Sequence, residues 1–275
     1  WPLYHHLTDA VARESWFLRQ GEPVRDTVLI HPMDSAFCLY RCGSDNSGRI
    51  RRYDIRFNET LRALVAMHEN FELGDEDSIA SKGFAGKEGF GIGKMTYKNV
   101  ILPYMLNIRN STLQLLKRYI SSGGNVIVLG NYPDRMDGEE AADSICSLLA
   151  GANFAKDHTE LERQLAETKH SYIFESDDDG SGVEIQYRED GEDRLIFLTD
   201  ADRHMTHRGR LILDGAYHAQ RLFPEDGSFQ DIFIIRDSGR TIVPVEIHPG
   251  EALLLYLMKA EEKKDTFQNR KSEHI

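Results

Sequence analysis

The pattern of apolar residues changes once along the chain, near residue 170. From 25 to 151, short apolar runs typical of buried strands alternate with segments that repeat apolar residues at helical spacing. This alternation predicts a doubly wound parallel sheet with helices on both faces. After 170, short apolar runs recur about every ten residues between Gly, Asp and Asn turns, which predicts an antiparallel β-sandwich.

We therefore expect an α/β domain over 1–151, a connecting helix over 152–169, a β-sandwich over 170–260 and a charged tail over 261–275. Within the α/β domain, helices are predicted over 2–20 and 58–70. Asn58 is the candidate N-cap of the second helix, because a short polar side chain there can accept from the first free N–H groups.

The chain carries a net charge of -12, which disfavours nucleic acid as a partner because phosphate binding needs clustered Lys and Arg. Its apolar runs are too short to span a bilayer, so no membrane partner is expected.

The chain has an odd number of cysteines, and their spacing is not that of a zinc site: Cys38, Cys42 and Cys146. Free thiols favour a reducing, cytoplasmic compartment, although the sequence leaves the localisation unknown. Because the chain begins at Trp1 without an initiator Met, we expect a segment of a longer protein; a removed tag or propeptide is the alternative.

The segment "GGNVIVLGNYP" (123–133) reads as a buried strand that stops in the turn Gly130-Asn131-Tyr132-Pro133. In an α/β hydrolase, a Ser or Cys nucleophile stands in such a turn. None stands here, and Cys146 is expected to be a buried structural thiol within a helix. No catalytic residue is therefore predicted at this strand end.

Other motifs favour ordinary structure over chemistry. The glycine-rich segment 89–94 precedes a strand and is expected to be a hairpin. The segment 175–186 resembles a calcium loop but has Gln186 where a bidentate carboxylate is required, so a solvated turn is expected. His204 and His207 lack a third ligand and are expected on the surface. We predict no metal site and no cofactor.

Two further turns follow the first two predicted strands, "IHPMDSAF" (30–37) and "ELGDEDS" (72–78). Both would lie at the carboxyl edge of the sheet, where His31, Asp34, Asp75 and Glu76 could converge. Paired carboxylates can perform acid/base chemistry or hold a sugar hydroxyl. The alternative is that Asp34 and Asp75 only cap helices.

Several segments in order resemble one family. "WPLYHHLTDAVARESWFLRQGEPVRDTVLIHPMDSAF" (1–37) is similar to a stretch of large bacterial α-L-rhamnosidase-type glycoside hydrolases that follows their catalytic barrel. "FELGDEDSIA" (71–80), "KMTYKNVILPYM" (94–105) and "STLQLLKRYISSGGNVIVLG" (111–130) continue the match. The resemblance covers about residues 1–150, and the later part resembles the family's C-terminal sandwich loosely.

The first domain also looks like the trimerisation domain of β-galactosidases, which implies a flavodoxin-like, class I glutamine-amidotransferase-like fold without the catalytic cysteine. The resemblance implies a non-catalytic C-terminal region of a bacterial carbohydrate-active enzyme, which lines sugar subsites or mediates assembly. Its implied partners are carbohydrate, the catalytic barrel of the parent protein, which this chain does not contain, and further copies in a homo-oligomer.

On this reading the ligand-binding candidates are all on carboxyl-edge turns: His31, Asp34, Asp75, Glu76, Asn131 and Tyr132. Tyr97, Tyr104 or Tyr132 could stack on a sugar ring. Two alternatives stay open. The chain could be a stand-alone amidotransferase-like hydrolase that uses Ser35 or Cys38 as nucleophile, or a structural oligomerisation module without a ligand.

Overall fold

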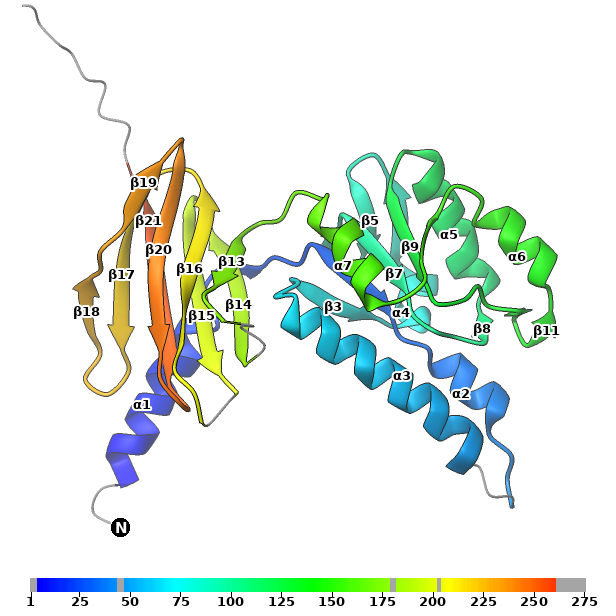
Figure 1. Cartoon of the computed structure of the whole chain (residues 1–275), viewed down its shortest axis with the longest axis horizontal. Helices are drawn as coiled ribbons and strands as arrows, with labels where there is room; N and C mark the ends of the chain where they lie inside the picture. The colour runs from blue at the N-terminus through cyan, green and yellow to red at the C-terminus, as the bar shows by residue number, and fades with distance from the viewer. Residues whose placement is uncertain (1–3, 44–46, 179–181, 202–203, 261–275) are drawn as a thin grey trace, which may run out of the picture.

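The computed structural model describes residues 4–43, 47–178, 182–201 and 204–260, and the predicted tail over 261–275 lies outside them. The described chain forms an α/β part and an antiparallel β part, which lie side by side in Figure 1. No helix among these residues is long and apolar enough to cross a membrane.

A five-stranded sheet, parallel throughout, is the centre of the α/β part. Its three central strands consist mostly of buried apolar residues, as expected for strands covered on both faces. In spatial order the strands are β12 (Asn153–Ala155), β9 (Asn125–Leu129), β7 (Asn99–Leu102), β2 (Thr27–Ile30) and β3 (Phe71–Gly74).

Helices cover both faces of this sheet, so the predicted α/β architecture is confirmed (Figure 1). Successive strand residues point to opposite faces: Val100 joins one core and Ile101 joins the other. The helices that pack on the first face are α4 (Glu76–Lys82), α5 (Asn110–Ser121) and α6 (Ala142–Leu148). Those on the second face are α3 (Ser47–Ala66) and α7 (His158–Ala166).

Short elements complete the α/β part. Helix α2 (Met33–Leu39) follows β2. The glycine-rich segment forms the predicted hairpin, because β5 (Gly89–Ile92) pairs antiparallel with β6 (Met95–Tyr97), and β4 (Gly83–Gly86) adds a third strand. A small sheet joins β8 (Asn107–Ile108), β10 (Arg135–Met136) and β11 (Glu139–Glu140).

Two antiparallel sheets form the β part and enclose one apolar core, so the predicted sandwich is confirmed. The first sheet contains, in order, β1 (Glu22–Pro23), β14 (Val183–Asp190), β15 (Asp193–Asp200), β21 (Ala252–Lys259), β17 (Tyr217–Phe223) and β18 (Ser228–Asp231). The second contains β13 (Ile173–Ser176), β16 (His207–Asp214), β20 (Arg240–Ile247) and β19 (Ile235–Asp237). One apolar run, 230–237, is divided between β18 and β19 and therefore contributes to both sheets.

The N-terminal segment packs on the sandwich, whereas the sequence analysis places it in the α/β domain. Helix α1 (Tyr4–Phe17) buries Phe17 against Leu195, Leu222 and Leu254, and β1 pairs with β14. The Arg188 guanidinium donates to two backbone carbonyls just before β1. Helical periodicity predicts the helix but not the partner on which its buried face lies.

Three local expectations need correction. Helix α3 begins at Ser47 and not at Asn58, whose amide donates to the Asp54 carbonyl inside the helix. The segment 152–169 contains the edge strand β12 before helix α7, so it is not one connecting helix. Cys146 is exposed, because Ile145 and not Cys146 points into the core.

Candidate functional site

Each of the predicted turns follows a strand of the parallel sheet at its carboxyl edge. His31 follows β2, Asp75 follows β3 and Asn131 lies just after β9. Because neighbouring parallel strands end on the same side, these turns open at one edge of the sheet.

Arg109, immediately before α5, organises the acidic residues of this edge. Its side chain donates to both carboxylate oxygens of Asp34, at 2.5 and 3.1 Å, and also to Asp77. Its backbone N–H donates to Glu76 Oε1 at 2.9 Å. The sequence analysis missed Arg109. Its one signal in the sequence is a single basic residue at the start of a predicted helix, in a sheet several of whose other turns are acidic.

The capping alternative is confirmed for Asp75 only. Asp75 is the N-cap of α4 and accepts from the Ser78 N–H at 3.0 Å. Asp34 lies in the first turn of α2 and pairs with Arg109 instead. Glu76 is buried, and burial raises the pKa of its carboxyl group, while the Arg109 N–H opposes this rise. Asp34, Asp75 and Glu76 are thus engaged in holding the edge together.

Aromatic rings surround the turn after β7. The Tyr104 ring lies 5.0 Å from that of Tyr53, and the Arg56 guanidinium lies 3.8 Å from the Tyr104 centroid. Burial, followed by the neighbouring Tyr104, raises the pKa of Tyr53 to about 12. His31 and Phe57 form a second ring pair at 5.2 Å. Helix α3 thus supplies Tyr53, Arg56 and Phe57 to the same edge.

The turn after β9 adds an amide and a stacked ring pair. Asn131 Nδ2 donates to the carbonyls of Tyr132, at 2.8 Å, and Met105, at 3.4 Å. Tyr132 stacks on Phe154 with ring centroids 5.8 Å apart and planes 10° apart. Tyr97 does not belong to this group, because it is buried in β6 and its hydroxyl donates to Glu72.

No activated nucleophile is found at this edge in the described part of the chain. Gly130, at φ +80°, occupies the first position after β9. Ser35 is fully buried, and its Oγ accepts from the Leu106 and Asn107 N–H groups, each at 3.0 Å. Partial burial raises the pKa of the Cys38 thiol, which favours the unreactive protonated form.

Two other expectations concern the sandwich. His207 is buried, contrary to the surface position expected, with its Nδ1 3.0 Å from Asp178 Oδ2. In the segment resembling a calcium loop, Glu175 pairs with Arg210 at 2.7 Å, and residues 179–181 lie outside the described residues. Within the described ranges, no group of three or more His, Cys, Asp or Glu side chains could hold a metal ion.

Comparison with known proteins gives a likeness in structure but not in sequence. No family model matches the sequence, and no curated protein matches it either. The solved structures that resemble this chain with a TM-score of 0.50 or more include several glycoside hydrolases.

The rhamnosidase from Novosphingobium sp. PP1Y matches 97% of this chain and 26% of its own length, at TM-score 0.63 and 16% identity. The exo-carrageenase GH42 from Bacteroides ovatus matches 88% of this chain and 30% of its own length, at TM-score 0.53 and 9% identity. The α-L-fucosidase isoenzyme 2 from Paenibacillus thiaminolyticus matches 92% of this chain and 51% of its own length, at TM-score 0.52 and 10% identity. At such identities the likeness shows the fold, and this chain spans about a quarter to a half of each of these proteins.

Proposed function

We propose that this chain is a non-catalytic, C-terminal region of a bacterial glycoside hydrolase and lies beside a catalytic barrel that the chain itself does not contain. One observation carries the proposal: nearly the whole chain matches about a quarter of a rhamnosidase. The Gly130-Asn131 turn, which lacks a nucleophile, supports it. The unpaired, exposed thiols of Cys38, Cys42 and Cys146 support a reducing compartment for the protein.

The α/β part is proposed to be a flavodoxin-like domain of the amidotransferase type that has lost its nucleophile, similar to a β-galactosidase trimerisation domain. Numbered along the chain, its parallel strands lie in the order 2-1-3-4-5, which is that of flavodoxin-like sheets. We further propose two domains, an α/β domain over about 24–169 and a sandwich domain made of 4–23 and 170–260, because the N-terminal segment packs on the sandwich.

At the carboxyl edge, His31, Asn131, Tyr104 and Tyr132 are proposed to contact a sugar. Rings and a side-chain amide are suited to stack on a sugar and to bond its hydroxyl groups. Asp34, Asp75 and Glu76 are proposed to act indirectly by fixing the turns, since the structure engages each of them in a cap, an ion pair or a buried hydrogen bond.

The proposal is tested by incubating the isolated chain with nitrophenyl α-L-rhamnoside, β-D-galactoside and α-L-fucoside. We expect no release of nitrophenol above the buffer rate. Enzyme-like turnover by the purified chain would contradict the proposal.

Two tests separate the alternatives. Rapid stoichiometric labelling of Cys38 by a thiol reagent would favour the stand-alone hydrolase, although the raised pKa of that thiol predicts slow labelling. If sugars leave the melting temperature of the chain unchanged while it self-associates, the oligomerisation module is favoured.

A further inference from the structure

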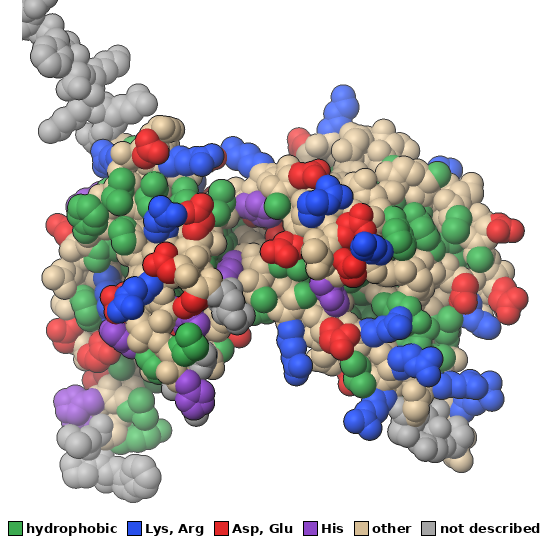
Figure 2. Space-filling model, in the orientation of Figure 1, with side chains coloured by type: hydrophobic (Ala, Val, Ile, Leu, Met, Phe, Trp, Pro, Cys, Tyr) green, Lys and Arg blue, Asp and Glu red, His purple; other side chains and the backbone are tan. Residues whose placement is uncertain are grey.

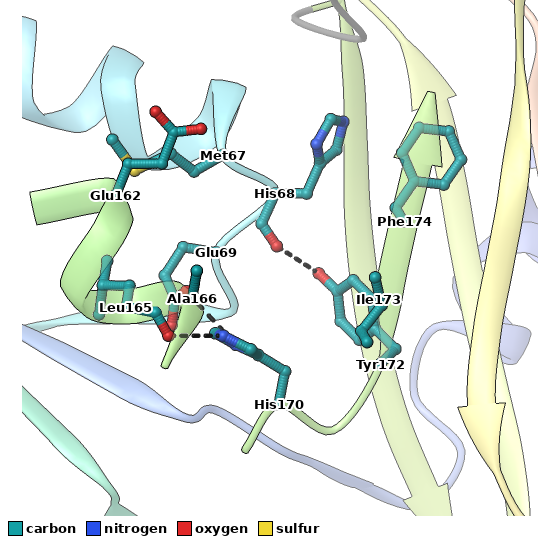
Figure 3. A pocket seen from close by; sticks show the side chains of 10 residues that line it. All are labelled: Met67, His68, Glu69, Glu162, Leu165, Ala166, His170, Tyr172, Ile173 and Phe174. Atoms are coloured by element: carbon teal, nitrogen blue, oxygen red, sulfur yellow. Dashed lines mark hydrogen bonds and ion pairs between the residues drawn. The ribbon is translucent and has the colours of Figure 1, made fainter. Parts of the chain in front are cut away.

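A pocket lies on the other side of the α/β part, where the chain passes into the sandwich (Figure 3). Its volume is ≈ 240 Å³, and its walls come from the segment after α3, from α7, and from β13 with the segment that leads into it. In Figure 2 the surface is recessed between the two parts of the molecule, and histidine side chains gather around this recess. The pocket combines apolar walls, such as Met67, Leu165 and Phe174, with ionisable side chains, which are Glu69, Glu162, His68, His170 and Tyr172.

The polar centre of the pocket is Glu69, whose side chain is only 3% exposed. Thr27 Oγ1 donates to its Oε1 at 2.5 Å, and Oε2 lies 3.6 Å from His170 Nδ1. His170 Nε2 lies 2.9 Å from the Leu165 carbonyl, which can only accept, so this nitrogen carries a hydrogen. His170 thus lies between the Leu165 carbonyl and the buried carboxylate of Glu69. Burial raises the pKa of Glu69 and His170 opposes this rise.

A directed chain of hydrogen bonds ends on Glu69. Across neighbouring strands, Asn153 donates to Asn125 and Asn125 donates to Asn99, both at 2.9 Å. Asn99 donates to Thr27 Oγ1 at 3.0 Å, so the Thr27 hydroxyl is committed as a donor to Glu69. Because all these dipoles point the same way, they polarise one another toward the carboxylate and fix its position. Glu69, in the segment between α3 and β3, is thus held in place by side chains on rigid strands, as a preorganised binding group requires.

The lining selects the chemistry of a ligand. An anion would face the carboxylates of Glu69 and Glu162. A purely apolar ligand would remove water from Glu69 without replacing its hydrogen bonds. A cation would compete with His170, which already faces the carboxylate. A neutral molecule with hydroxyl groups and a C–H face can donate hydrogen bonds to the carboxylates and pack against the apolar side chains.

We propose that this pocket binds one neutral hydroxylated ring of the monosaccharide class, with hydroxyl groups on Glu69 and Glu162 and its C–H face on Leu165 and Phe174. The volume is below the usual range for drug-sized ligands, about 300–1,000 Å³, which favours a single ring over a chain. The ligand class rests on the proposed function, but the location is separate from the carboxyl edge.

The test is a titration of the whole chain with L-rhamnose, D-galactose and L-fucose, followed by the imidazole C–H signals in two-dimensional NMR. His68 and His170 report on this pocket, and His31 reports on the carboxyl edge. We expect at least one sugar to shift the His68 and His170 signals saturably. Glu69→Gln should weaken this binding about tenfold, since a charge-assisted hydrogen bond is lost.

Matched variants keep the test independent of folding. Glu162→Gln, on the exposed side of α7, should also weaken binding, whereas Glu167→Gln, at the C-cap of this helix and outside the pocket, should not. Absence of any shift at His68 and His170 would overturn the proposal, as would a shift insensitive to both pocket variants. Shifts confined to His31 would overturn it while supporting the proposed function, and turnover of nitrophenyl glycosides would contradict the proposed function alone.

Discussion

At the scale of single residues, Arg109 is the side chain on which the carboxyl edge depends most. Arg109→Ala would leave Asp34, whose side chain is 19% exposed, without its cationic partner. We expect the free energy of unfolding to fall by about 2 kcal/mol, the range of hydrogen bonds to charged groups. Urea unfolding measures this change.

The matched control is Arg163→Ala, which removes an exposed pair between α7 and its C-cap residue Glu167. Its expected cost is below about 1 kcal/mol, because exposed ion pairs contribute little. Equal losses in the two variants would show that the Arg109 cluster has no special structural role.

Glu76 gives a prediction about pH. Its pKa is raised above the ordinary 4.5 by burial, so the folded state binds this proton more tightly than the unfolded state. The resulting stabilisation of the folded state is complete at pH values below the ordinary pKa of 4.5, and it is lost as pH rises through the raised pKa. Relative to Glu76→Gln, the natural chain should therefore become less stable as pH increases above the ordinary value of 4.5. Urea unfolding across this range measures the difference, and a difference independent of pH would contradict the assignment.

At the scale of elements, the end of β9 depends on the left-handed conformation of Gly130, at φ +80°. A Cβ there would meet only Tyr104, at 3.8 Å, so space is not the obstacle. Gly130→Ala should destabilise the chain by about 1–2 kcal/mol through backbone strain alone. In Gly86→Ala, at a position with ordinary φ and open space, the same measurement should show no loss. A Gly130 variant as stable as the Gly86 variant would refute this view of the turn.

The elements that the sequence predicts well have a strong local signal. Strands β2, β7 and β9 are continuous apolar runs, and the sandwich strands recur with clear turns between them. Strand β12 has only three residues, two of them exposed, so its hydrogen bonds to β9 define it more than its composition does. The first half of α3 is exposed and rich in arginine, which hides its helical period.

The candidate site was predictable only at the level of the sheet edge. Parallel strands bring the turns of His31, Asp75 and Asn131 to one side, and this follows from topology. Side-chain partners do not follow from it: the pairing of Arg109 with Asp34 joins residues 75 positions apart. The pocket around Glu69 was missed for the same reason, because Glu69 and His170 meet only in the folded chain.

At the scale of the whole molecule, Asp26 fastens the connection between the two parts. It is 1% exposed and accepts from Lys98 Nζ at 2.5 Å and from the N–H and hydroxyl of Ser171, each at 2.9 Å. Ser171 lies between α7 and β13. Asp26→Asn should therefore lower the free energy of unfolding by about 2 kcal/mol and loosen this connection.

Limited trypsin digestion checks the loosening, because Lys169 lies exposed in the connecting segment. Cleavage after Lys169 should be faster in Asp26→Asn than in the natural chain, and Ser171→Ala should give an intermediate rate. If all three chains were cut at the same rate, Asp26 would not control the connection.

This chain is proposed to function as one part of a larger glycoside hydrolase. The most direct measurement is the size of the natural polypeptide that contains it, determined by an antibody against the chain and by mass spectrometry of the protein that it captures. We expect a polypeptide well beyond 275 residues whose additional peptides belong to a catalytic barrel. A natural product of the size of this chain alone would contradict the account.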